Sequence, residues 1–240
     1  MSESSVPEQY LIVCFGTSIT QGVPHVPPED TYPALLERRL SHRLAESGPK
    51  VTVINSGVSG HNTAEGLARI KPDVLAHQPD LVVIEFACND VRYEPDKRVE
   101  LDQFAANLKQ MTARIREVGA EIIITTPSPI IDAYHEYSKE IDFYDPWGGC
   151  NAALDEYAEV VRQVAAQEEV TLCDIGRAFL ERALEAEFED RTADCSDLCC
   201  LAEYIRQADG VHLTVPGHRL MAAELYKIIA PRLLSHCSPA

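Results

Sequence analysis

The chain has 240 residues, 45% of them hydrophobic, which is enough to build one complete core. Its 21 Lys and Arg stand against 38 Asp and Glu, and the net charge of −17 disfavours nucleic acids and anionic membranes as partners. No apolar run reaches membrane-spanning length, and residues 1–9 lack the basic region of a secretory signal. We therefore expect a single domain over residues 1–240, located in the cytoplasm and without membrane insertion.

The eight cysteines point to the same compartment. In a chain without a secretory signal, free thiols are a simpler expectation than four disulfides. Cys195, Cys199 and Cys200 form a cluster, but their spacing has no nearby His or second Cys pair and does not match usual zinc ligands. We predict neither a metal nor a cofactor.

Apolar runs and helical patterns alternate along the chain. Strands are expected at residues 10–15, 51–54, 81–86, 121–125 and 170–173. Apolar residues recur at helical spacing in residues 32–47, 63–76, 99–118, 151–167 and 217–234. With right-handed crossovers this rhythm predicts an α/β fold, a flavodoxin-like three-layer α/β/α sandwich of about five parallel strands with helices on both faces.

A serine follows the first predicted strand in the segment Phe-Gly-Thr-Ser at residues 15–18. Ligands of parallel sheets bind outside the carboxyl ends of the strands, and a turn containing Gly16 brings Ser18 to that edge. Taken alone, a serine at this position is more often a helix N-cap than a nucleophile.

Two further polar segments follow predicted strands. Gly60 comes after the strand at 51–54 and precedes a helix, so its N–H can point into the crevice. Asn89 follows the strand at 81–86, where its carboxamide can donate to a developing oxyanion. We interpret Asp90, beside it, as a hydrogen-bond acceptor that orients this turn.

Asp209 and His212 stand three positions apart on a predicted loop before the last helix. An imidazole activates a serine hydroxyl by taking its proton, and a carboxylate fixes the imidazole tautomer. The plainer alternative is a helix N-cap aspartate beside a surface histidine.

Together and in this order, Ser18, Gly60, Asn89 and His212 make the chain resemble the SGNH hydrolase superfamily, also called GDSL-type esterases and lipases. The resemblance spans nearly the whole chain. It implies a serine hydrolase acting on ester bonds, with Ser18 as nucleophile, His212 as general base and Asp209 as its orienter. It also implies an oxyanion hole formed by the N–H groups of Ser18 and Gly60 and the amide of Asn89.

Two positions depart from the family signature. Thr17 stands where the family usually has Asp, and we expect its hydroxyl to hydrogen-bond the local backbone instead. Ala87 stands where the third block usually has Gly, and its methyl group is expected to reshape the pocket without removing the Asn89 donor.

Two segments are longer than this fold requires. Residues 127–149 are rich in aromatic side chains, which either wall an acyl or sugar pocket or pack the loop against its own body. Residues 188–207 contain the cysteine cluster and are interpreted as a helical flap. His25 and His61 are possible rim residues that we read as solvated, and His218 is expected to face solvent or a neighbouring loop.

The sequence thus predicts a serine esterase that hydrolyses a small acyl ester or an acetylated carbohydrate through an acyl-enzyme on Ser18. One alternative is an acyltransferase that passes the same acyl group to an alcohol. Another is an inactive, carbohydrate-binding relative. Acyl length, the alcohol and the oligomeric state are left open by the sequence.

Overall fold

The computed structural model describes residues 9–45, 48–136, 138, 141–189 and 198–235. Five strands form one parallel sheet in the order β2-β1-β3-β4-β5. Their bounds are β1 (Gln9–Gly16), β2 (Lys50–Gly57), β3 (Leu81–Glu85), β4 (Glu121–Thr125) and β5 (Thr171–Cys173). The predicted fold class is confirmed, and every predicted strand is present with bounds shifted by a few residues.

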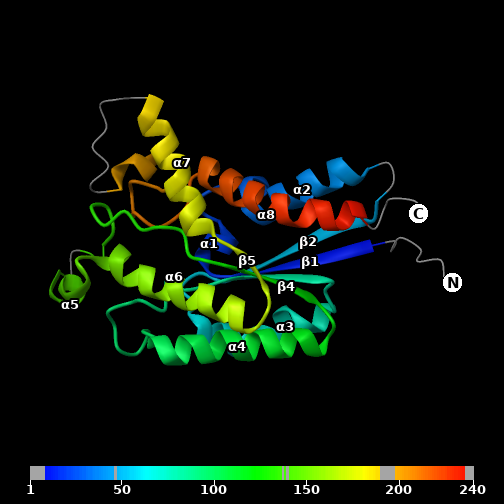
Figure 1. Ribbon diagram of the computed structural model, residues 1–240, viewed down its shortest axis with the longest axis horizontal. Coiled ribbons are helices and arrows are strands. Elements are labelled where there is room, and N and C mark those ends of the chain that lie inside the picture. The colour runs from blue at the N-terminus through cyan, green and yellow to red at the C-terminus, as the bar shows by residue number, and fades with distance from the viewer. Residues whose placement is uncertain (1–8, 46–47, 137, 139–140, 190–197, 236–240) are drawn as a thin grey trace.

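Helices follow the strands on both sides of the sheet (Figure 1). The α-helices are α1 (Ser18–Gln21), α2 (Tyr32–Leu44), α3 (Thr63–Asp73), α4 (Leu101–Glu117), α5 (Ile141–Tyr144), α6 (Cys150–Gln167), α7 (Ile175–Glu189) and α8 (Val215–Ser235). Short 3₁₀ turns are η1 (Pro28–Asp30), η2 (Leu75–His77), η4 (Asp145–Trp147) and η5 (Cys199–Glu203). The sequence analysis missed α7, although its buried Ile175, Phe179 and Ala183 recur at helical spacing.

Two hydrophobic clusters hold the layers together, one on each face of the sheet. In β3, Leu81 and Val83 belong to the cluster between the sheet and helices α2 and α8. Val82 and Ile84 belong to the cluster between the sheet and helices α3, α4 and α6. Because side chains alternate along a strand, a central strand buried on both faces must be apolar throughout. Each such side chain contributes about 1.5–3 kcal/mol by leaving water. This double burial fixes the strand register and so the positions of the strand ends.

The strand order creates a switch point between β1 and β3. After β1 the chain continues to α2 on one face, and after β3 it continues to α4 on the opposite face (Figure 1). A crevice opens at the carboxyl ends of two strands whose connections diverge in this way. Ser18 follows β1 and Asn89 follows β3, so both residues lie at this edge of the sheet.

His218 departs from the sequence expectation that it faces solvent. It lies in the first turn of α8, is only 1% exposed, and accepts a hydrogen bond on Nδ1 from the Tyr32 backbone N–H at 3.2 Å. Burial lowers the pKa of His218 to about 4, and the neighbouring His212 and His25 add to this effect. Its sequence position at the helix start carried no signal that α2 would cover it.

This burial predicts a pH dependence of folding. The neutral imidazole is favoured in the fold, so stability from His218 is full above pH 6.5 and is lost as the pH falls from 6.5 towards 4. The loss from this one group is about 3 kcal/mol. Urea unfolding of wild type and His218→Gln at pH 7 and pH 4 will show the two free energies of unfolding converging at low pH. Parallel pH curves would contradict it.

The cysteines only partly follow the expectation of free thiols. Cys14, Cys88, Cys150 and Cys173 are free and buried. Cys200, however, is disulfide-bonded, which corrects the prediction for this residue; its partner is not among the described side chains. Cys195 and the side chain of Cys199 lie outside the described residues. The cytoplasmic location was predicted from the lack of a recognisable secretory signal and from the expected free thiols; it stays a prediction, and the disulfide at Cys200 weakens its second argument.

Across the described helices, none combines the length and the apolar character needed to cross a bilayer.

Candidate active site

Ser18 is placed by a sharp turn at the end of β1. Thr17 caps α1, and its Oγ1 accepts from the Ile19 N–H at 3.2 Å, the local backbone hydrogen bond expected from the sequence. Gly16 is required here because a Cβ would lie 2.6 Å from the Glu85 carbonyl oxygen. The turn leaves Ser18 only 8% exposed, as the first residue of α1.

A buried carboxylate holds this turn from the neighbouring strand. Oε2 of Glu85, the last residue of β3, accepts from the Thr17 N–H at 3.0 Å and from the hydroxyls of Thr17 and Thr20 at 2.9 and 2.8 Å. Burial raises the pKa of Glu85 to about 7 despite these hydrogen bonds. Glu85 was not singled out in the sequence, although a lone charge ending an all-apolar strand is a signal. Thr17 therefore stands beside a carboxylate supplied by β3.

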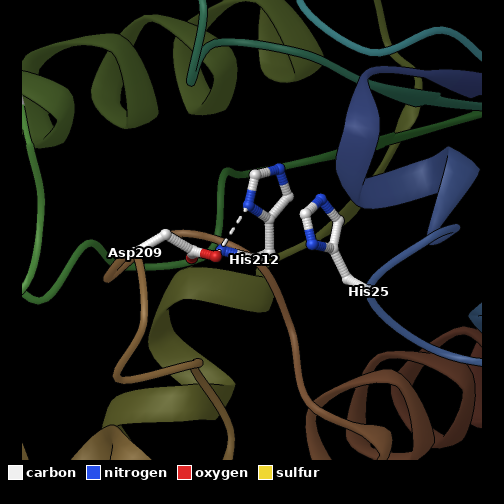
Figure 2. A group of neighbouring side chains, drawn as sticks. All are labelled: His25, Asp209 and His212. Atoms are coloured by element: carbon white, nitrogen blue, oxygen red, sulfur yellow. Dashed lines mark hydrogen bonds and ion pairs between the residues drawn. The ribbon is translucent and has the colours of Figure 1, made fainter.

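His212 lies on the other side of Ser18. Its Nε2 is 3.0 Å from Ser18 Oγ, although the two residues are 194 positions apart. Asp209 Oδ1 accepts from the backbone N–H groups of Val211 and His212 at 3.0 and 2.8 Å, which bends the loop. Asp209 Oδ2 lies 3.3 Å from His212 Nδ1 (Figure 2). This contact has an ion-pair distance, but no described acceptor is aligned for a hydrogen bond with that nitrogen.

Asp209 is ionised in this arrangement. Burial opposes the charge, but the contacts from the side chain and backbone N–H of His212 and from the Val211 N–H outweigh it, so the pKa of Asp209 lies well below its usual range. A permanent carboxylate beside Nδ1 favours the tautomer in which Nε2 can accept a proton.

The two predicted oxyanion donors reach the same place. Gly60 has φ +77°, and an added Cβ would meet no atom within 4 Å, so the backbone here faces open space. Asn89 Nδ2 donates to the His61 carbonyl at 2.9 Å, which anchors the carboxamide and leaves its second N–H for another acceptor. The structure thus brings together Ser18, Gly60, Asn89, Asp209 and His212.

These five residues line one cavity of about 230 Å³. The other lining residues are mostly polar: Ser59, Cys88, Arg92, His135, Glu136 and Val211. A larger cavity of about 760 Å³ lies between α2 and β2, but none of the predicted site residues lines it. The candidate site is therefore identified by the predicted residues that meet in one cavity, and not by the volume of that cavity.

The long segment at residues 127–149 divides into two parts. His135 and Glu136 reach the cavity, and burial lowers the pKa of His135 to about 4. The described aromatic residues pack elsewhere: Phe143 contacts Tyr144 and Trp147, and the Tyr144 hydroxyl donates to the Val91 carbonyl at 3.1 Å. Phe143 and Trp147 also line a separate cavity of about 220 Å³, which none of the predicted site residues lines, so both readings of the sequence, a pocket wall and packing of the loop, stay predictions.

Asp90 and Ala87 lie beneath the site. Asp90 Oδ1 accepts from both the N–H and the hydroxyl of Thr63, which ties the turn after β3 to the start of α3 as predicted. Ala87 has φ +122° and is fully buried in the hydrophobic cluster between the sheet and helices α3, α4 and α6. It is not among the residues that line the cavity at Ser18, so its expected effect on the pocket stays a prediction.

The remaining histidines of the sequence analysis have partners. Arg69 Nε donates to His61 Nδ1 at 3.1 Å. His25 is partly exposed and stacks on the ring of His212, so it lies beside the site, as the rim reading predicted. Polar atoms of His25, Asp209 and His212 lie within 4.8 Å of one another, a spacing that could suit a metal ion. The Arg206 guanidinium binds both His25 and Asp209, however, and stacked rings do not converge their lone pairs on one point.

Comparison with known proteins agrees with this geometry. The model of the GDSL-like Lipase/Acylhydrolase family matches residues 14–220, a span that includes every predicted catalytic position. The chain belongs to this family. This membership, together with its esterase relatives, shows that the protein is a serine hydrolase acting on ester bonds.

Among solved structures of the family, a lipase/acylhydrolase from Enterococcus faecalis is similar with a TM-score of 0.70 and 27% identity, covering 96% of this chain and all of that one. An acetylxylan esterase of Geobacillus stearothermophilus is 29% identical over 72% of this chain and 69% of its own length. An isoamyl acetate-hydrolyzing esterase 1 homolog of Rattus norvegicus is 28% identical over 93% and 83%.

An arylesterase of Vibrio mimicus is 36% identical over 125 residues, which cover 52% of this chain and 57% of that relative.

The departure of Thr17 from the family signature yields a double-mutant prediction. Thr17→Asp puts a second carboxylate beside Glu85, and the free energy of unfolding at pH 8 should fall by at least about 2 kcal/mol. Adding Glu85→Gln removes the repulsion and should restore part of that loss. Urea unfolding of the two single variants and the double variant measures this coupling. Strictly additive losses would show that the two positions do not share one carboxylate site.

Proposed function

We propose that this protein is a serine esterase for small acyl esters, acetyl esters above all, and that Ser18 carries the acyl group. The observation that supports this most directly is the 3.0 Å contact between Ser18 Oγ and His212 Nε2 beside the donors Gly60 and Asn89. Nucleophile, base and oxyanion donors are the minimal set for acyl transfer to serine.

The first half of the reaction forms the acyl-enzyme. His212 Nε2 takes the proton of Ser18 as Oγ attacks the ester carbonyl carbon. The imidazolium formed is stabilised by the ionised Asp209, 3.3 Å from Nδ1. The carbonyl oxygen becomes an oxyanion that accepts from the N–H groups of Ser18, Gly60 and Asn89, which are fixed by the fold before the substrate arrives. His212 then gives its proton to the departing alcohol oxygen.

The second half releases the acid. Water replaces the alcohol beside His212, loses a proton to Nε2 and attacks the acyl carbon. The oxyanion of the second tetrahedral intermediate accepts from the same N–H donors. When this intermediate breaks down, the bond to Ser18 Oγ is cleaved and His212 returns the proton to Oγ. No step requires a metal or a cofactor, because His212 supplies the base as a neutral imidazole and the acid as the imidazolium that it becomes.

Cavity and relatives together favour a short acyl group and a polar alcohol. The cavity measures about 230 Å³, and its rim carries Arg92, His135 and Glu136, side chains that suit hydroxyl groups better than a hydrocarbon chain. Two relatives bear the names of enzymes for acetyl esters, one of them with a carbohydrate alcohol. We propose an acetylated carbohydrate or a similar polyol ester as the substrate class.

Transfer of the acyl group to an alcohol uses the same intermediate and is distinguished by its products. An inactive binding relative is disfavoured because the Ser18–His212 contact is intact.

Covalent labelling tests the nucleophile. A fluorophosphonate should add once to the wild-type protein, because Oγ of Ser18 is activated by His212, and intact-mass measurement should find no adduct on Ser18→Ala. Esters of acetate with simple alcohols and with sugars should be hydrolysed by wild type alone. A folded wild-type protein that takes no label would refute the proposal.

Removal of one oxyanion donor tests the transition-state role of Asn89. Asn89→Ala should lower kcat by about a hundredfold to a thousandfold with a much smaller change in KM, since the oxyanion exists only during the reaction. Asn89→Asp has the same size but no donor and adds a negative charge beside the oxyanion, so it should be at least as slow as Asn89→Ala. Thermal unfolding must be compared, since the Asn89 side chain also anchors the His61 carbonyl. Full activity in either variant would exclude this role.

A further inference from the structure

A second imidazole lies against the general base. The ring of His25, from the loop after α1, stacks on the ring of His212 with centroids 3.7 Å apart and planes inclined by 21°. Figure 2 shows His212 lying between Asp209 and His25. The family resemblance assigns no role to His25, and the reaction derived above does not use it.

Arg206 fixes the tautomer of this second imidazole. Its Nη1 contacts both His25 Nδ1 and Asp209 Oδ2, the latter at 2.8 Å. A guanidinium has donors only, so His25 Nδ1 must accept, and the ring carries its proton on Nε2. Burial, together with the neighbouring His212 and Arg206, lowers the pKa of His25, which favours its neutral form.

The orientation of the rings places that proton at the reacting edge. The Nδ1 atoms of His25 and His212 both face the pair formed by Asp209 and Arg206. His212 Nε2 faces Ser18. Because the rings are nearly parallel, Nε2 of His25 points to the same side as Nε2 of His212 (Figure 2). His25 does not itself line the cavity at Ser18, but it is stacked against His212, which does.

We propose that His25 determines specificity for the alcohol: its Nε2–H donates to an oxygen on the carbon next to the ester-bearing carbon. Esters with a vicinal hydroxyl or ether oxygen, as in sugars and glycerol, present such an acceptor beside the ester oxygen held at His212. A hydrocarbon alcohol has no such oxygen, so the His25 N–H finds no hydrogen-bond acceptor on the bound substrate. This inference rests on the proposed esterase function and narrows its substrate class.

Two nearly isosteric esters test it, 2-hydroxyethyl acetate and propyl acetate, which differ by a hydroxyl in place of a methyl group. Wild type should favour the hydroxylated ester in kcat/KM by about fivefold, the effect of one hydrogen bond between neutral groups. His25→Phe keeps a ring against His212 but has no donor, and this preference should disappear. His25→Gln places an amide N–H near the position of Nε2 without the ring, and the preference should persist.

The ratio of the two kcat/KM values within one variant cancels a general loss of activity, and comparing this ratio between wild type and each variant cancels the difference in intrinsic ester reactivity. Equal values in wild type, or an unchanged ratio in His25→Phe, would overturn the proposal. So would loss of the preference in both variants, since the ring and not the N–H would then carry it. Failure of wild type to hydrolyse either ester would instead refute the esterase function itself.

Discussion

The buried Glu85 carboxylate is the constraint on which the site depends. It ends β3, yet its hydrogen bonds go to the turn after β1, so it joins the two strands at the switch point of the sheet. A buried carboxylate without such partners would be costly, and a turn without the carboxylate would leave the buried Thr17 N–H without its acceptor. The need to satisfy both sets of groups fixes Ser18 relative to β3 and therefore relative to Asn89.

A second carboxylate organises the opposite side of the cavity. Asp209 bends its own loop through two backbone N–H groups with one oxygen, and with the other it contacts both His212 and Arg206. Arg206 in turn holds His25 against the face of His212. One charge thus contacts His212 directly and His25 through Arg206, so the proposed general base and the proposed donor to the alcohol depend on the same carboxylate.

The scaffold and the cavity are built by different parts of the chain. Doubly buried strands such as β3 leave no freedom of register, because a shift by one residue would exchange the two hydrophobic clusters. The polar rim comes instead from loops, among them His135 and Glu136 in the long segment after β4. Rigid strand ends carrying the chemistry and loops carrying the rim are a common division in α/β enzymes. This separation explains why membership of the family leaves the alcohol of the substrate undetermined.

The sequence by itself determined the layers of this protein, the strand ends that carry Ser18 and Asn89, and the loop before the last helix that carries His212, because apolar runs and the turns that follow them are local properties of the chain. It did not predict Glu85, Arg206 or the stacked His25, nor the burial of His218 under α2. These residues contact partners that are distant in the sequence. Glu85 accepts from Thr20, 65 positions away, and Arg206 contacts His25, 181 positions away. Only the tertiary structure decides such contacts, since a charge or an imidazole in a loop is equally compatible with solvent until the packing of distant elements closes over it.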